Sequence, residues 1–236
     1  MSQVRAIVFD TFGTVVDWRG SLIADFTQWA QAKNISGDWT ALVDGWRAAY
    51  RPSMDAVRKN PARGFLILDE LQRQSIEPLT ASLGIKGLDA KDFDYLTYAW
   101  RRLDPWPDCV PGLTRLKTKF IIGPLSNGNV GLLVDLAKYG GLPWDVILSA
   151  ELFGHYKPDG EVYRGAAKLL SLAPEQMMLV AAHNYDLAAA QNEGLKTCFV
   201  PRVTEYGPHQ NSDFKAEGKW DYVVKDLVDL ADQLGC

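Results

Sequence analysis

The stretch from Val4 to Trp18, VRAIVFDTFGTVVDW, constrains the fold more than any other part of this chain. Residues 4–9 form a short apolar run rich in β-branched side chains, which is typical of a strand buried on both faces, as in a parallel sheet. The run ends at Asp10, and Gly13 follows three residues later. A carboxylate at the end of a buried parallel strand lies where open α/β sheets bind ligands, although an Asp there also commonly begins a turn.

Beyond residue 104 the chain alternates between short apolar runs and amphipathic segments. We predict strands at 120–125, 146–149, 177–181, 196–200 and 222–224, and helices at 113–118, 132–139, 160–170, 185–193 and 226–234. This alternation predicts an α/β fold, a doubly wound Rossmann-like parallel sheet. Because its crossovers are right-handed, the loops that follow the strands should meet at one edge of the sheet.

The segment between the first strand and this alternating part contains no strand pattern and predicts consecutive helices. The expected boundaries are Ser21 and Thr40 as N-caps, a third helix from Gly64 to about Leu83, a fourth over residues 89–103, and interruptions at Pro52 and Pro61. We therefore assign residues 1–16 and 99–236 to an α/β core domain. Residues 17–98 are assigned to a helical cap subdomain inserted after strand 1.

Composition narrows the classes of function. The 236 residues carry a net charge of −4 without a run of Lys or Arg, which argues against a nucleic acid partner. No apolar stretch approaches the roughly 18 residues of a membrane span, and no signal peptide precedes the first strand. Three scattered cysteines indicate a reducing cytoplasm, and with only three histidines we expect no zinc site. The chain is compatible with a homodimer.

Four predicted loops bring polar side chains to the same edge of the sheet. They carry Asp10, Phe12, Gly13 and Thr14; Ser126 and Asn127; His155, Tyr156, Lys157 and Tyr163; and His183, Asn184 and Asp186. Each loop alone has a simpler explanation, since Ser126-Asn127 is also a plausible helix cap and Lys157 a plausible solvated lysine. Four polar loops at the expected positions together predict a functional site.

The motifs DTFGT, LSNGN and YKPDGEVY, followed by a late Asp, resemble the haloacid dehalogenase superfamily, and within it the L-2-haloacid dehalogenases. The resemblance covers essentially the whole chain. Phosphatases of this superfamily carry D-x-D, whose second Asp is a general acid and helps to place Mg²⁺. Here Phe12 takes that position, and a phenyl ring neither donates a proton nor binds a hard cation. Asp186 also stands alone where the phosphatases usually carry an acidic pair.

The resemblance therefore implies a metal-independent hydrolase without a cofactor. Asp10 would attack carbon 2 of a short (S)-2-haloacid or a haloacetate, invert that carbon and form an aspartyl ester. Water would then attack the carboxyl carbon of the ester and release a 2-hydroxyacid. A Mg²⁺-dependent phosphatase-like hydrolase is the alternative, and a non-catalytic binding module with the same fold is a second.

The resemblance also implies roles for individual residues. Lys157, with Thr14 beside it, would keep Asp10 ionised inside a desolvated pocket. The substrate carboxylate would be bound by Ser126 and by the backbone N–H groups of Thr11 and Phe12.

The remaining roles concern the halide and the lysine. Arg47, in a Trp-Arg pair similar to that of the family, would bind the leaving halide, with Arg51 as the second choice and Asn127 as a further donor. Asp186 would orient Lys157 or the hydrolytic water. Tyr163, six residues after the lysine, would bond to Lys157 or near the nucleophile.

The fourth loop departs from the family pattern S-x-N-x-x-D. Ala181 stands at the Ser position and His183 at the Asn position, while Asp186 keeps its place. We expect His183 to donate to a halide or carboxylate, or to narrow the pocket. A narrower pocket would favour haloacetates and a small halogen.

Overall fold

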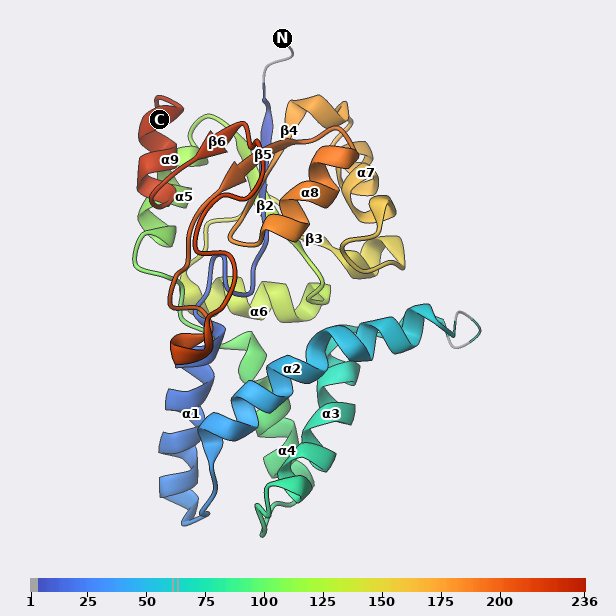
Figure 1. Cartoon of the computed structure of the whole chain (residues 1–236), viewed down its shortest axis with the longest axis vertical. Helices are drawn as coiled ribbons and strands as arrows, with labels where there is room; N and C mark the ends of the chain where they lie inside the picture. Colours follow the sequence, from blue (N-terminus) through green and yellow to red (C-terminus); the bar gives the residue numbers. More distant parts are fainter. Residues whose placement is uncertain (1–3, 61, 63) are drawn as a thin grey trace.

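The computed structural model describes residues 4–60, 62 and 64–236. Its strands are β1 (Ala6–Phe9), β2 (Ile121–Ser126), β3 (Leu148–Ser149), β4 (Met177–Ala181), β5 (Lys196–Phe199) and β6 (Tyr222–Val223). They form one sheet in the order β3-β2-β1-β4-β5-β6, in which every neighbouring pair is parallel (Figure 1). This order defines a Rossmann-like doubly wound sheet and confirms the predicted fold class.

Helices cover both faces of the sheet (Figure 1). After β1 the chain forms α1 (Trp18–Lys33), α2 (Trp39–Arg58), α3 (Leu68–Ser82), α4 (Ala90–Thr97) and the short 3₁₀ helix η2 (Tyr98–Arg101). The remaining helices are α5 (Cys109–Leu116), α6 (Val130–Gly140), η3 (Ala150–Phe153), α7 (Gly160–Leu169), η4 (Pro174–Gln176), α8 (Asn184–Asn192), η5 (Gly207–His209) and α9 (Leu227–Gln233). Figure 1 shows α5 and α9 on one side of the sheet and α7 and α8 on the other.

Strand β1 is buried on both faces, as predicted. Ile7 and Phe9 belong to one apolar cluster with side chains of α5, α6 and α9, whereas Ala6 and Val8 belong to a second cluster with α7 and α8. Successive side chains of a strand point to opposite faces, so β1 anchors both layers of helices. Asp10 therefore leaves the strand at the centre of the molecule.

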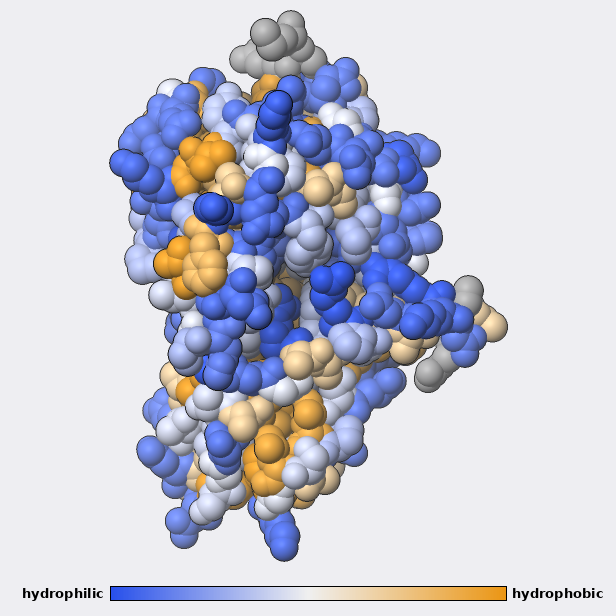
Figure 2. All heavy atoms as spheres, viewed as in Figure 1, coloured by the Kyte–Doolittle hydropathy of each residue, from blue (hydrophilic) through white to orange (hydrophobic). Residues whose placement is uncertain are grey.

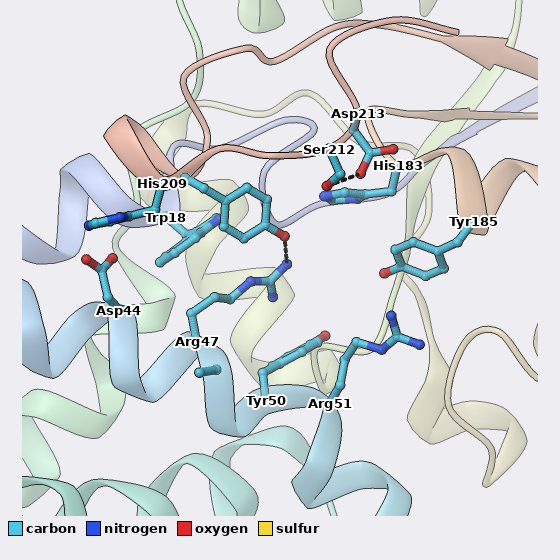
Figure 3. A pocket seen from close by; sticks show the side chains of 12 residues that line it. Trp18, Asp44, Arg47, Tyr50, Arg51, His183, Tyr185, His209, Ser212 and Asp213 are labelled. Carbon is cyan, nitrogen blue, oxygen red and sulfur yellow. Dashed lines mark hydrogen bonds between the residues drawn. The ribbon is translucent and has the colours of Figure 1, made fainter. Parts of the chain in front are cut away.

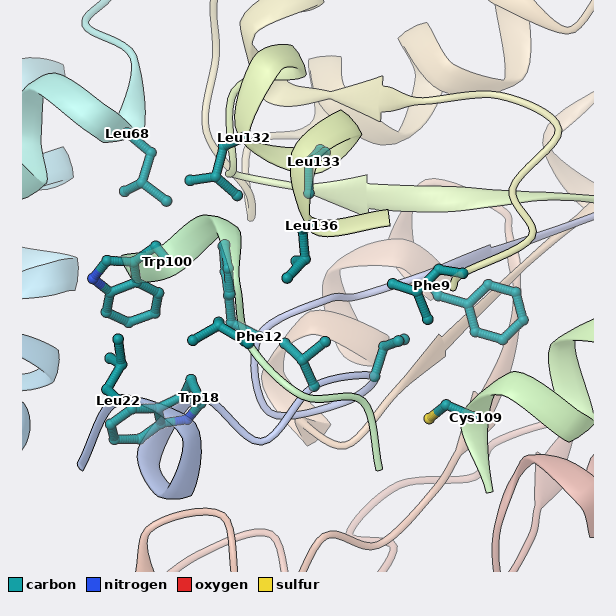
Figure 4. Packing of buried hydrophobic residues seen from close by; sticks show 14 of the residues in the cluster. Phe9, Phe12, Trp18, Leu22, Leu68, Trp100, Cys109, Leu132, Leu133 and Leu136 are labelled. Atoms are coloured by element: carbon teal, nitrogen blue, oxygen red, sulfur yellow. The ribbon is translucent and has the colours of Figure 1, made fainter. Parts of the chain in front are cut away.

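Helices α1 to α4 lie together below the sheet (Figure 1). The first apolar cluster continues into them, because Phe12, Trp18 and Trp100 pack between the sheet and the cap helices (Figure 4). The outer surface on the side drawn in Figure 2 is mainly hydrophilic, with apolar patches on the helical part and on the upper part of the molecule. The division into residues 1–16 and 99–236 against 17–98 stays a prediction.

Across the described ranges, none of the helices combines the length and the apolar character that crossing a membrane requires.

The predicted N-caps of the first two helices are wrong. Ser21 lies within α1, whose N-cap Asp17 accepts a hydrogen bond from the Gly20 amide at 2.8 Å. Thr40 lies within α2, where Asp38 accepts from the Ala41 amide at 2.9 Å. Asp is at least as good an N-cap as Ser or Thr, so the earlier aspartates begin the helices.

Two further helix boundaries also differ. Pro52 does not interrupt α2, which continues past it with buried side chains on both sides of the proline, so tertiary packing outweighs the lost hydrogen bond. The predicted break at Pro61 lies outside the described residues. The third helix begins at Leu68 and not at Gly64, whose φ of +74° is incompatible with a helix.

Candidate active site

The site lies at the carboxyl ends of the central strands. Asp10 directly follows β1, and its backbone N–H donates to the Val180 carbonyl of the neighbouring β4 at 3.0 Å. Ser126 ends β2, and His183 follows β4 as the N-cap residue of α8. Because the strands are parallel and adjacent, side chains that are far apart in the sequence meet at this edge.

The Asp10 carboxylate is buried and accepts hydrogen bonds at both oxygens. Oδ1 accepts from Lys157 Nζ at 2.8 Å. Oδ2 accepts from Thr14 Oγ1 at 2.8 Å and lies 2.9 Å from His183 Nδ1. Thr14 Oγ1 in turn accepts from the Ala182 amide at 2.9 Å, so the direction of its own hydroxyl is fixed. The structure thus brings together Asp10, Thr14, Lys157 and His183.

Lys157 lies between two carboxylates. Its ammonium group contacts Asp10 on one side and Asp186 on the other, and Asp186 also accepts from the Tyr163 hydroxyl. Asn127 Oδ1 accepts from the Lys157 backbone N–H at 2.7 Å, which ties the lysine to the end of β2. The lysine is therefore held by side chains from three different loops.

Burial and the charges within the cluster shift the pKa values of Asp10 and Asp186 in opposite directions. Burial alone would raise the pKa of Asp10, but Lys157 and His183 outweigh it and hold that pKa well below its usual range. Asp186 contacts only one cation, and burial raises its pKa. For Lys157, burial favours the neutral form, yet the two carboxylates raise its pKa above the ordinary value. Asp10 is thereby kept as the anion that a nucleophile must be.

Glu205 completes the cluster and was missed in the sequence. Its Oε2 lies 2.9 Å from His183 Nε2, and its Oε1 accepts from Trp18 Nε1 at 2.9 Å. The side chain is 1% exposed and comes from the long connection between β5 and β6. The one sequence signal was Gly13: its φ is +89°, and a Cβ there would lie 2.1 Å from Glu205 Oε1. The glycine signals a close approach but does not identify the approaching residue.

A cavity of about 420 Å³ adjoins the cluster (Figure 3). It is lined by Trp18, Asp44, Arg47, Ala48, Tyr50, Arg51, His183, Tyr185, Tyr206, His209, Ser212 and Asp213. Figure 3 shows Arg47 and Arg51 extending from α2 towards the side of the core that carries His183 and Tyr185. The cavity is therefore walled by the cap on one side and the core on the other.

Arg47 is the less exposed of the two arginines that line this cavity. Its guanidinium lies 5.2 Å from the Trp18 ring centroid and 4.6 Å from that of Tyr50, and its Nη2 donates to the Tyr206 hydroxyl at 3.3 Å. Its Nη1 is buried without a hydrogen-bond partner among the described residues. Arg51 also lines the cavity, with its guanidinium 5.0 Å from the Tyr185 ring. An unsatisfied N–H group on a side chain that lines a cavity is suited to bind an anion.

Several predicted site residues are not among those that line this cavity. Tyr163 is fully buried, and its hydroxyl donates to Asp186, which also contacts Lys157; a contact of Tyr163 with the substrate stays a prediction. The Asn127 side chain supports the Lys157 backbone, and Ser126 Oγ accepts from the Gly128 amide at 3.2 Å. Phe12 packs edge-on against the Trp100 ring at 5.2 Å. Thr11 Oγ1 is buried with no hydrogen-bond partner in the described part of the chain.

The donor set does not suit a divalent cation. The ammonium group of Lys157 lies between the carboxylates of Asp10 and Asp186, and the side chain of Phe12 offers no oxygen. Hard cations such as Mg²⁺ need several oxygen ligands. Within residues 4–60, 62 and 64–236, no group of three or more His, Cys, Asp or Glu side chains is arranged to hold a metal ion.

Comparison with known proteins identifies the family. The model of haloacid dehalogenase-like hydrolases matches residues 4–194, and the chain belongs to this family. A solved structure of an L-2-haloacid dehalogenase is 49% identical, with a TM-score of 0.95 over 98% of this chain and 99% of that one. A solved defluorinating L-2-haloacid dehalogenase is 47% identical, with a TM-score of 0.95 over 99% and 96% of the two chains.

A more distant relative carries the same assignment. The (S)-2-haloacid dehalogenase of Pseudomonas putida is 25% identical over 239 residues, which cover 99% of this chain and 98% of that protein. These matches confirm the resemblance to L-2-haloacid dehalogenases that the sequence motifs predicted.

Proposed function

We propose that this protein is a hydrolase of carbon–halide bonds that converts 2-haloacids to 2-hydroxyacids and releases halide. The observation that carries the proposal is the buried Asp10 carboxylate, which Lys157 and His183 keep ionised beside a cavity with an unsatisfied arginine N–H group. The names of the relatives support the same activity. The phosphatase alternative is weaker, because Phe12 stands where the second Asp would be needed and the ammonium group of Lys157 already pairs with both Asp10 and Asp186.

The mechanism follows from these side chains. Asp10 attacks carbon 2 in line with the carbon–halogen bond, so that carbon inverts and an aspartyl ester forms. Water then attacks the carboxyl carbon of Asp10. The 2-hydroxyacid leaves with one oxygen that came from Asp10, and no metal ion takes part.

Substrate binding divides between the cap and the core. Arg47 binds the departing halide through its unsatisfied Nη1, at the point where negative charge develops. Ser126, the Thr11 and Phe12 amides and the Thr11 hydroxyl bind the substrate carboxylate. The preference for short (S)-2-haloacids or haloacetates and small halogens, donation by Asn127 to the halide, a homodimer and a cytoplasmic location all stay predictions.

Replacing Arg47 with Met should lower kcat/KM for halide release by on the order of 10²–10³, the usual effect of losing one donor to developing charge. The matched control is Arg51→Met, four residues along the same helix, for which we expect less than about a tenfold loss because its side chain is exposed. Halide release and thermal unfolding are measured for both variants. Equal losses in the two variants would contradict the role of Arg47.

The activity itself is tested by halide release from each enantiomer of 2-chloropropionate and from fluoroacetate and chloroacetate, with and without EDTA. We expect turnover of the (S) enantiomer with inversion, unchanged by EDTA. Loss of activity in EDTA that Mg²⁺ restores would favour the phosphatase-like alternative. Equal turnover of haloacetate by a His183→Asn variant would remove the expectation that His183 selects short substrates.

A further inference from the structure

We infer that His183 and Thr14 form an oxyanion site on Asp10 Oδ2, and that Glu205 is the buried counter-ion that holds His183 there as an imidazolium. The inference rests on the proposed function, because the oxyanion forms only when an ester of Asp10 is hydrolysed. It gives His183 a role in the second chemical step, and it assigns Glu205 to the site as a positioning residue.

The contacts of His183 fix its protonation. Nδ1 lies 2.9 Å from Asp10 Oδ2, and Nε2 lies 2.9 Å from Glu205 Oε2. An ionised carboxylate only accepts hydrogen bonds, so both ring nitrogens must donate, and only the imidazolium does so. Burial opposes the charge, but Glu205 and Asp10 together raise the pKa of His183 well above 6.5.

The other charged or titratable groups near the ring do not change this assignment. Tyr185 lies beside the imidazole at 5.6 Å between ring centroids. Lys157 reaches the opposite oxygen of Asp10, and Arg47 lies 3.6 Å from Glu205 Oε1, the oxygen that His183 does not contact. Both cations are therefore separated from the imidazolium by a carboxylate.

The hydrogen bonds also distinguish the two oxygens of Asp10. Oδ2 accepts from both Thr14 and His183, which fills its two lone-pair positions, whereas Oδ1 accepts from Lys157 alone. Oδ1 thus keeps a free lone pair for attack on carbon 2. Once the ester has formed, Oδ2 is its carbonyl oxygen, still facing the same two donors.

Hydrolysis of the ester begins with water. The oxygen of water bonds to Cγ of Asp10, one proton of the water passes to Asp186, and the carbonyl electron pair moves onto Oδ2. The oxyanion collapses, the bond between Cγ and Oδ1 breaks, and Oδ1 leaves as the alkoxide of the 2-hydroxyacid. The alkoxide takes the proton from Asp186, and the new Asp10 carboxyl group releases its remaining proton to solvent.

The geometry suits such a site. The two donors lie 2.8 and 2.9 Å from Oδ2, which matches the separation of about 2.7–3.1 Å expected for oxyanion donors. Thr14 accepts from the Ala182 amide and Glu205 accepts from Trp18, so neither donor has to rearrange when charge develops. A fixed cation beside Oδ2 stabilises the oxyanion more strongly than a neutral amide would.

The test separates the two steps in single-turnover experiments with (S)-2-chloropropionate. The halide burst reports ester formation, and the mass of intact Asp10-ester protein reports ester decay, each from about pH 6 to pH 10. In the wild type we expect ester decay to slow as pH rises, because the imidazolium is present below its pKa and lost above it. In His183→Asn the burst should stay within a few-fold, while ester decay should slow by on the order of 10²-fold and lose this pH dependence.

Glu205→Gln provides the second variant. Removing its charge lowers the pKa of His183, so the fall in ester decay should move to lower pH while the halide burst is preserved. His155→Asn, a change at a half-exposed histidine outside the site, is the control and should behave as the wild type. A purely structural role for His183 would slow both steps equally.

Two outcomes would overturn the inference. One is an ester decay that rises with pH in the wild type and loses that rise in His183→Asn, since that is the behaviour of a histidine base. The other is His183→Asn with wild-type decay and pH profile. A wild-type protein that releases no halide would instead overturn the proposed function, and this inference with it, so the two failures are distinguishable.

Discussion

Replacing Asp10 with Asn is expected to reduce halide release from (S)-2-chloropropionate by roughly 10⁴-fold or more, the scale of loss that follows removal of a covalent nucleophile. The amide has nearly the shape of the carboxylate but lacks the anionic oxygen that attacks carbon 2. Halide release is measured at saturating substrate, and circular dichroism and thermal unfolding show whether the variant is folded.

The matched control is Asp135→Asn, the same chemical change at an exposed carboxylate of α6 that pairs with Arg101. It should retain wild-type activity. A folded Asp10→Asn variant that keeps more than about a tenth of the wild-type rate would show that another group attacks the substrate.

Replacing Lys157 with Met should lower both the stability and the activity of the protein. It leaves Asp10 and Asp186 buried with one cation fewer, and breaking a buried ion pair in this way typically costs about 3–5 kcal/mol. We also expect halide release to fall by on the order of 10³-fold or more, because the pKa of Asp10 rises and less of the nucleophile is ionised. The free energy of unfolding in urea measures the first effect.

The loss of stability in Lys157→Met should depend on pH. In the variant the carboxylates have raised pKa values in the folded state, so their contribution to stability is lost as pH rises through those values. The destabilisation relative to wild type should therefore be largest near neutral pH and shrink as pH falls towards about 4, where unfolded carboxylates also take up protons. Lys196→Met, which removes an exposed pair with Asp221, should cost less than about 1 kcal/mol at both pH values. Equal losses in the free energy of unfolding for the two lysine variants would contradict the pairing of Lys157 with two buried carboxylates.

The sheet could be predicted because each strand is marked locally by its apolar run. Asp10, Lys157 and Asp186 could be predicted for a related reason: Asp10 follows β1, Lys157 lies in the connection before α7, and Asp186 lies in the first turn of α8, all at the edge where the loops meet. The helix starts in the cap were less predictable, since Asp17 competes with Ser21 as N-cap on local chemistry alone.

The role of Glu205 could not be predicted from the sequence. It lies in a long connection without periodicity, and it contacts Trp18, which is 187 positions away in the chain. Such a contact depends on how the loop folds back over the sheet, and no local pattern encodes that path. The partner of the Tyr163 hydroxyl could not be identified from the sequence for the same reason, because the Asp186 oxygen that accepts its hydrogen bond is placed only by the tertiary fold.

The covalent role of Asp10 is tested most directly by multiple turnovers in H₂¹⁸O, followed by mass spectrometry of the peptide that contains this residue. Because water attacks the carboxyl carbon of the ester, ¹⁸O is predicted to accumulate in the Asp10 carboxylate, and the product of the first turnover should carry unlabelled oxygen. Label that appears in the product from the first turnover, and never in Asp10, would contradict the aspartyl ester.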